Sequence, residues 1–282
     1  MSNKQYTITF DNGIDAPLVI GSGTPYGIIS TEGFDGKNID VEVDEYQFDG
    51  GKIRKQRIAT RDMSIGFDYS GDDIATQDCV EGLFSPHKPG ILRVNNQGRE
   101  RSIGYVPTYI GDKRENLYHN LEFEVQLKGP YGWFADADYH LVELTSWVGG
   151  FTLPTQLPFS LRHRGVAKQL VKNEGHAYAP VWVQFKGPAN NPKVTNETTG
   201  VHVQIGATLT ADQTLHIKTD TNTPTVEIEE NGVFTNAYPL LAFGSKMSFG
   251  LAIGDNVLRY ETADANQVNQ VNVLYKNLYM GA

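Results

Sequence analysis

The sequence predicts a mainly β protein made of two domains. Runs in which apolar and polar residues alternate recur along most of its 282 residues, and this period of two is typical of strands with one buried face. The 29 glycines and 13 prolines separate these runs at intervals of about 8–12 residues, a spacing that indicates β-sandwiches. The length allows two domains. We expect an N-terminal β-sandwich domain with one helix over 1–138 and a C-terminal β-sandwich domain over 139–282.

In the N-terminal domain, the apolar alternation and the turn residues between runs predict a series of strands and one helix. The helix is expected over 72–84, where Val80 and Leu83 fall on one face at helical spacing and the proline-containing segment 85–90 ends it. Cys79 lies on the same face, and we expect it to be part of the core. The expected strands are 5–10, 16–20, 26–30, 91–95, 101–109 and 117–128.

The segment 28–69 is the most informative part of this domain. It predicts three strands separated by two polar turns, since Val41 and Val43 alternate with acidic residues and the odd positions from Met63 to Tyr69 are apolar or aromatic. We expect a hairpin over 41–67 whose long tip, 49–57, has two glycines at its bend and four basic residues just beyond it. These residues are Lys52, Arg54, Lys55 and Arg57. A charged hairpin that extends past its own core is suited to contact with a neighbouring subunit.

In the C-terminal domain, the strand signals return after a less regular stretch at 134–180. Val181 and Val183 alternate with Trp182. The pair Asn231–Gly232 between two apolar runs is a strong signal for a two-residue hairpin turn. Further strands are expected at 201–205, 215–217, 248–253, 257–262 and 269–279.

Composition excludes several classes of protein. The formal net charge of −9 argues against general nucleic-acid binding, which needs a basic surface. The single cysteine excludes an intrachain disulfide and a cysteine-rich metal site. The N-terminal residues lack the apolar region of a secretion signal, and no run reaches the roughly 18 apolar residues of a membrane span. We therefore expect a protein made in the cytoplasm, with no membrane insertion.

No motif for catalysis is present. The spacing of Asp136 and Asp138 allows a metal site but is more simply a solvated domain junction, and Glu229 and Glu230 beside a hairpin turn read as an exposed edge that resists strand pairing. A nucleophilic triad would need an anchoring motif that the sequence does not contain. We expect no enzyme activity, no cofactor and no metal.

Trp182 is the residue that suggests an alternative function. It is out of phase with Val181 and Val183, so its indole is expected on the solvent side of its strand. An exposed indole can stack on the C–H face of a pyranose ring. The alternative hypothesis is therefore a carbohydrate-binding adhesion module that recognises host cell-wall saccharide.

The order of these parts resembles that of the siphophage distal tail proteins. In the first half, the resemblance rests on segment 28–69, the single helix after it, and the strand that ends LKGPYGWF at Phe134. In the second half, NEGHAYAPVWVQFKG at 173–187 is similar to the family's N-x-G, proline and glycine-terminated strand. LHIKTD at 215–220 resembles its l-x-I-D-T strand, with Lys218 where an aspartate is common. Asn231–Gly232 and Gly254–Asp–Asn256 match its two late turns.

This resemblance implies a structural virion protein. It implies that the N-terminal domains of six copies close into a ring and that the C-terminal domain is galectin-like. Such a homo-hexameric hub links the tail tube to the baseplate or tail-tip protein and carries receptor-binding or peripheral baseplate proteins in host attachment. In this hypothesis hairpin 41–67 crosses to the adjacent subunit, where its basic residues pair with the acidic N-terminal domain. Residues 1–138 contain 22 of the 33 acidic residues.

Overall fold

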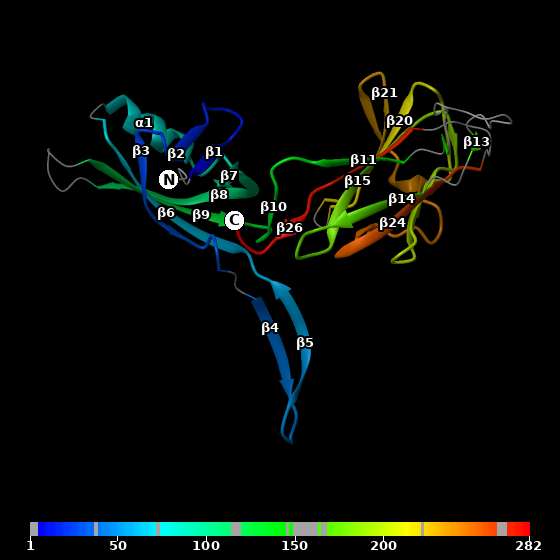
Figure 1. The fold of residues 1–282 in the computed structure, drawn as a ribbon, viewed down its shortest axis with the longest axis horizontal. Helices are drawn as coiled ribbons and strands as arrows, with labels where there is room; N and C mark the ends of the chain where they lie inside the picture. Colours follow the sequence, from blue (N-terminus) through cyan, green and yellow to red (C-terminus); the bar gives the residue numbers. More distant parts are fainter. Residues whose placement is uncertain are drawn as a thin grey trace, which may run out of the picture. The chain divides into compact units, whose positions relative to one another are not determined.

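A computed structural model describes residues 5–36, 39–71, 74–113, 120–144, 147–148, 163–164, 168–220, 223–263 and 270–282. The chain forms two compact units (Figure 1). Unit 1 consists of Met1–Ala137 together with Leu278–Ala282, and unit 2 consists of Asp138–Asn277. Almost every element is a strand, so the predicted all-β class with a single α-helix in the described residues is confirmed.

Unit 1 holds the helix and a bent antiparallel sheet. Its main path runs β2-β1-β7-β8-β9-β6-β3, and β10 joins it by pairing with β8 and β26. Its elements are β1 (Tyr6–Asp11), β2 (Leu18–Gly21), β3 (Tyr26–Glu32), β4 (Ile39–Glu45), β5 (Gly51–Ile58), β6 (Arg61–Tyr69), α1 (Ile74–Leu83), β7 (Gly90–Asn96), β8 (Arg99–Lys113), β9 (Leu121–Gly129), β10 (Phe134–Asp136) and β26 (Leu278–Tyr279).

The long strand β8 connects the two halves of this sheet. Its first half pairs with β7 and its second half with β9, and the register shifts between Pro107 and Tyr109. Such an irregularity bends a strand and increases its twist. The alternating buried residues of β6 and β9 therefore face the same core as those of β1 and β7.

Helix α1 packs against unit 1 through the apolar residues at its C-terminal end. Val80, Leu83 and Phe84 are buried, and the Phe84 ring meets the Phe10 ring edge to face at 4.9 Å. Cys79, by contrast, is exposed. The expectation that Cys79 belongs to the core was wrong, because the apolar face of this short helix is narrower than the spacing suggested.

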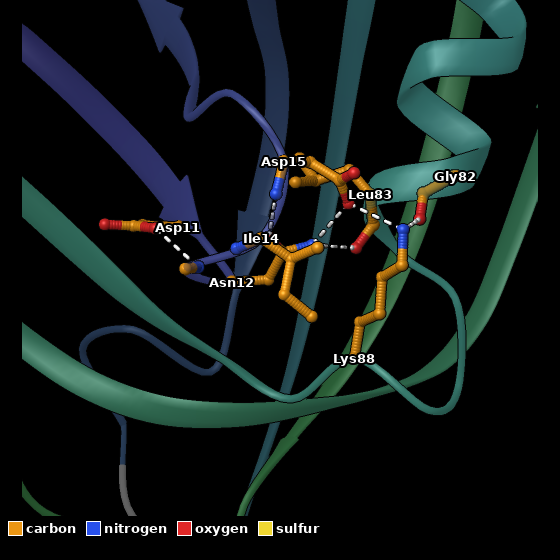
Figure 2. Close-up of polar contacts among 8 residues, drawn as sticks. Asp11, Asn12, Ile14, Asp15, Gly82, Leu83 and Lys88 are labelled. Atoms are coloured by element: carbon orange, nitrogen blue, oxygen red, sulfur yellow. Dashed lines mark hydrogen bonds and ion pairs between the residues drawn. The ribbon is translucent and has the colours of Figure 1, made fainter.

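Polar contacts fix the end of α1 to the turn between β1 and β2 (Figure 2). The Asn12 amide donates to the Leu83 carbonyl oxygen at 3.3 Å, and Lys88 donates to the Gly82 carbonyl oxygen at 3.1 Å and to Asp15 Oδ2 at 2.7 Å. A helix end leaves its last carbonyl groups without partners and carries partial negative charge. The Asn12 amide and the Lys88 ammonium donate hydrogen bonds to these carbonyl groups, and the positive charge of Lys88 is favourable at the negative end of the helix.

Unit 2 is a sandwich of two main antiparallel sheets. One sheet has the order β11-β25-β15-β20-β21-β22, and the other has the order β14-β24-β17-β18. Its elements are β11 (His140–Leu144), β12 (Trp147–Val148), β13 (His163–Arg164), β14 (Lys168–Asn173), β15 (Ala179–Lys186), β16 (Ala189–Asn190), β17 (Lys193–Asn196), β18 (Val201–Gln204), β19 (Thr208–Leu209), β20 (Gln213–Lys218), β21 (Thr225–Glu230), β22 (Val233–Asn236), the 3₁₀ turn η1 (Tyr238–Leu240), β23 (Gly250–Leu251), β24 (Gly254–Glu261) and β25 (Gln270–Tyr275).

In the order of the chain, unit 2 is inserted into unit 1. The chain leaves unit 1 after β10 and returns to it at β26, and these two strands pair with each other, with Ala135 opposite Leu278. The expected run at 269–279 is accordingly divided between β25 in unit 2 and β26 in unit 1. The sequence placed the domain boundary after residue 138, and the first part of unit 1 ends at Ala137. The sequence did not indicate that residues 278–282 belong to unit 1.

Candidate interaction surfaces

Strands β4 and β5 form a two-stranded arm that is separate from the sheets of both units. The arm comprises residues 39–58, and within the described residues its strands pair only with each other. Figure 1 shows it extending away from the ends of β3 and β6. A five-residue loop, 46–50, joins the strands and is closed by a hydrogen bond from Tyr46 N to Gly50 O at 3.1 Å. Gly50 has φ +103°, which disfavours a side chain there.

Two expectations about this segment were wrong. Residues 51–58 form a strand rather than part of the hairpin tip, because each basic residue predicted in the tip lies opposite or beside an acidic residue of β4. The predicted hairpin over 41–67 is a hairpin over 39–58, since β6 pairs with β3 and β9 and belongs to the sheet of unit 1.

One face of the arm is apolar and exposed. The register places Val43 opposite Ile53 and Ile39 opposite Ile58, so these side chains share a face. Ile39, Val41, Val43 and Ile53 are 45–60% exposed, and Phe48 in the loop is 85% exposed. We call these four strand residues the apolar face of the arm. A two-stranded hairpin with nothing packed on its apolar face is marginal by itself, so this face indicates a partner.

The opposite face of the arm is a ladder of charges. Arg57 pairs with Asp40 at 2.9 Å, Lys55 with Glu42 at 3.7 Å, and Arg54 with Asp44 at 4.0 Å. Three of the four basic residues singled out by sequence are thus brought against acidic residues of their own arm. Lys52 lies opposite Asp44 in the register and forms no ion pair within the described part of the chain. Exposed pairs of this kind contribute about 0.2–1 kcal/mol each.

A buried arginine that follows the arm joins the two segments on either side of the arm within unit 1. Arg61, the first residue of β6, is 4% exposed and donates hydrogen bonds to backbone carbonyl oxygens from three separate segments. The acceptors are Gly33, Phe34 and Gly36, before the arm, Gly132, after β9, and Met280, near the end of the sequence. Its guanidinium also lies over the Phe134 ring, 4.9 Å from the centroid. Burial lowers the pKa of Arg61.

A hollow of about 920 Å³ lies over the outer face of β3, β6, β9 and β8. Its lining includes two exposed apolar side chains, Ile29 at 57% and Tyr109 at 50%. Five carboxylates line it as well, against a single basic residue, Lys113. They are Glu32, Asp62, Asp112, Glu122 and Glu124. We call this hollow the acidic groove.

In unit 2, Trp182 belongs to a linked set of side chains on the outer face of the larger sheet. Its indole N–H donates to His216 Nδ1 at 3.2 Å, and His216 Nε2 lies 2.8 Å from Glu229 Oε2. Lys218 Nζ lies 4.7 Å from the centroid of the Trp182 ring, and Tyr139 meets the ring edge to face at 6.3 Å. The expected solvent-side position of Trp182 is confirmed, but its ring is only partly exposed.

Sequence reasoning missed Arg61 and His216. For Arg61 a signal existed, since it shares the odd phase of Met63, Ile65 and Phe67 and so falls on the buried face of β6. For His216 none existed, because its partners lie 34 residues before it and 13 after it. Among the residues that the structure describes, no group of three or more His, Cys, Asp and Glu side chains is placed to hold a metal ion. The helix within the described ranges lacks the length and apolar character needed to cross a lipid bilayer.

The chain resembles known phage proteins in part of its sequence and in its fold. Residues 174–279 match the family model described as the siphovirus-type tail component, C-terminal domain. The SPP1 Dit (gp 19.1) protein, described as a paradigm of the hub adsorption apparatus in phages that infect Gram-positive bacteria, aligns over 98% of this chain and 99% of its own, with a TM-score of 0.64 and 11% identity. A chain of the phage P2 baseplate in its activated conformation with Ca aligns over 97% and 98%, with a TM-score of 0.57 and 12% identity. A search of curated protein sequences returned no match.

The fold and the matched segment define a class. Residues 174–279 match a siphovirus-type tail component domain, and the chain shares its fold with the SPP1 Dit protein and with a chain of the phage P2 baseplate. More particularly, the resemblance to the siphophage distal tail proteins is confirmed, for unit 2 by the family model and for the whole chain by the shared fold.

Proposed function

We propose that this protein is a ring-forming hub of a phage tail, in which six copies assemble through the arm. The ring joins the tail tube to the baseplate or tail-tip protein and carries receptor-binding or peripheral baseplate proteins, and the chain acts structurally rather than as an enzyme. The observation that supports this best is the apolar face of the arm, which is exposed in the single chain. Its residues are a run of β-branched side chains on one face of a hairpin, a surface that gains stability only when another surface covers it.

The proposed partner of the arm is a second copy of the chain. An arm on one side of a subunit and a receptive surface on another side form a head-to-tail contact, and such contacts close into rings when the rotation between copies allows it. The acidic groove is the receptive surface that we assign. Ile29 and Tyr109 offer apolar area to the apolar face of the arm. The groove carboxylates offer partners to Lys52, the basic residue of β5 that has no ion pair on its own arm among the described residues. Charges at the rim of an interface steer association and fix register more than they add affinity.

The apolar face provides the test of this assignment. Replacing Val41, Val43 and Ile53 together by threonine keeps β-branched side chains, which suit a strand, but removes apolar area from the contact. We expect monomers in light scattering and no rings in electron micrographs. A matched triple replacement of Leu170, Val233 and Ile253 by threonine changes exposed apolar residues of unit 2, which are 61–66% exposed, and should leave the rings intact. Rings that persist in the arm variant would refute the assignment.

The groove is tested by reversing its charge. Glu122→Lys with Glu124→Lys replaces two groove carboxylates by positive charges near the position proposed for Lys52 of the neighbouring arm, and like charges across a contact disfavour association. Ring assembly should then be slower and weaker at low salt, and salt should reduce the difference from the wild type because it screens exposed charges. Unchanged assembly at low salt would place the receptive surface elsewhere on the subunit.

A further inference from the structure

The outer face of the larger sheet in unit 2 holds a carboxylate in a fixed direction. The indole N–H of Trp182 can only donate, so Nδ1 of His216 accepts and Nε2 carries the proton. That proton is donated to Glu229 Oε2 at 2.8 Å. His216 is 6% exposed, while the Glu229 side chain is 36% exposed. The buried imidazole therefore orients a carboxylate that still reaches solvent.

An exposed aromatic ring lies beside this carboxylate. Phe234 of β22 is opposite Glu229 of β21 in the register, and its ring centroid is 5.6 Å from that of His216. The Phe234 side chain is 56% exposed. Trp182 is less available for stacking, because Lys218 lies over its ring. The face thus combines an open ring, Phe234, with an oriented hydrogen-bond acceptor, Glu229.

We propose that this face binds a neutral saccharide. The C–H face of a pyranose can stack on Phe234, while its hydroxyl groups donate to the free lone pairs of the Glu229 carboxylate in charge-assisted hydrogen bonds. Trp182 and His216 act as positioning residues, since they hold the carboxylate and do not themselves meet the sugar. An anionic saccharide would be repelled by Glu229 and by its neighbours Glu227 and Glu230 on the same strand.

A protein partner fits this face less well. Interface cores are depleted of charged residues, and covering Glu229 with a protein surface that supplies no donor would leave a buried carboxylate without a full set of partners. A saccharide supplies hydroxyl donors at its periphery and leaves the remaining lone pairs in water. The inference does not rest on ring formation, because it concerns a surface formed by unit 2 alone.

The test uses the full chain and a printed array of neutral and anionic oligosaccharides. Soluble chitotriose and maltotriose serve as titrants in tryptophan fluorescence and calorimetry up to roughly millimolar concentration. The central variant is Phe234→Ala, and its matched control is Phe243→Ala, an equally conservative change at a fully exposed phenylalanine in the same unit. Glu229→Gln removes the charge while keeping a carbonyl oxygen for His216.

We expect the wild type to bind neutral glycans. Phe234→Ala and Glu229→Gln should each weaken this binding about tenfold or more, and Phe243→Ala should leave it unchanged. Ring ¹⁵N shifts of His216 should report the Nε2–H tautomer in the wild type and a changed tautomer balance in Trp182→Phe, together with weaker binding. Three results would overturn the proposal. They are no neutral glycan retained by the wild type, retention of anionic glycans alone, and equal losses in the Phe234 and Phe243 variants.

Discussion

The guanidinium of Arg61 donates a hydrogen bond to the carbonyl oxygen of Met280, 219 residues later in the chain. The same side chain holds the carbonyl groups of Gly33 and Phe34, which precede the arm. One residue thus joins the strand that leaves the arm, the segment that enters it and the last residues of the sequence. Ala282 N adds a bond to Phe34 O at 3.1 Å. These contacts hold the segments on both sides of the arm against the body of unit 1.

Replacing Arg61 by alanine should destabilise unit 1 by about 3 kcal/mol or more, because several buried carbonyl groups lose a charged donor at once. Calorimetry of the full chain should show a lower melting temperature for the unit 1 transition and an unchanged one for unit 2. Arg99→Ala is the control, since Arg99 is exposed and donates a single bond to Ala282 O at 2.9 Å. Equal effects of the two changes would contradict the anchoring role of Arg61.

The ion pair between Lys88 and Asp15 gives unit 1 a defined pH dependence. The Lys88 ammonium and the Asn12 amide lower the pKa of Asp15 below its ordinary value of 3.8. A carboxyl group whose pKa is lowered by folding stabilises the folded state above its unfolded pKa and loses that contribution as the pH falls through the folded pKa. Asp15→Asn should therefore be less stable than the wild type near about pH 7, with the difference shrinking below about pH 4. Denaturant titrations at the two pH values measure it, and a difference that grows on acidification would contradict the assignment.

Asn256 in unit 2 is expected to be critical for stability. It is fully buried, accepts from Ala252 N and Asn196 Nδ2 at 2.9 Å each, and donates to the carbonyl oxygens of Ala252 and Gly254. Asn256→Ala should lower the free energy of unfolding by about 2–4 kcal/mol, because buried polar groups are left unpaired. Asn236→Ala, at an exposed amide that accepts one bond from Tyr238 N, should cost about 1 kcal/mol or less. Similar unfolding curves for both variants would argue against this network.

The exposure of Cys79 is tested by its reactivity. It is the only cysteine and lies on the exposed side of α1, so an aromatic disulfide reagent should titrate one thiol per chain in native buffer. Addition of denaturant should not increase the number of thiols that react. A thiol that reacts only after unfolding would restore the core position expected from the sequence.

The sequence was a good guide where a pattern is local and a poor one where partners are distant. Alternation predicted strands over Met63–Tyr69 and 117–128, where the structure has β6 and β9, since burial follows the period of two. It misplaced the arm, because Lys52 to Arg57 resemble a polar loop until the acidic residues of β4 are set opposite them. The sites of Arg61 and His216 depend on strand register across a sheet and on returning segments, and neither is encoded in local spacing. The motif Gly254–Asp–Asn256 was read from the sequence as a turn, which was wrong, because these residues begin β24 and pair with β14. The hydrogen bonds of Asn256 explain why an amide is required there.

The central claim is that the arm closes a ring of six copies, and native mass spectrometry tests it most directly. The register places Ile39 opposite Ile58, so residues 40–57 can be replaced by a short Gly-Ser linker without separating the ends of the arm. The wild type should give a species of six times the 31.2 kDa chain mass, and the linker variant should give folded monomers with an unchanged circular dichroism spectrum apart from the lost arm. A wild type that stays monomeric at all concentrations, or a linker variant that still forms the sixfold species, would contradict the account.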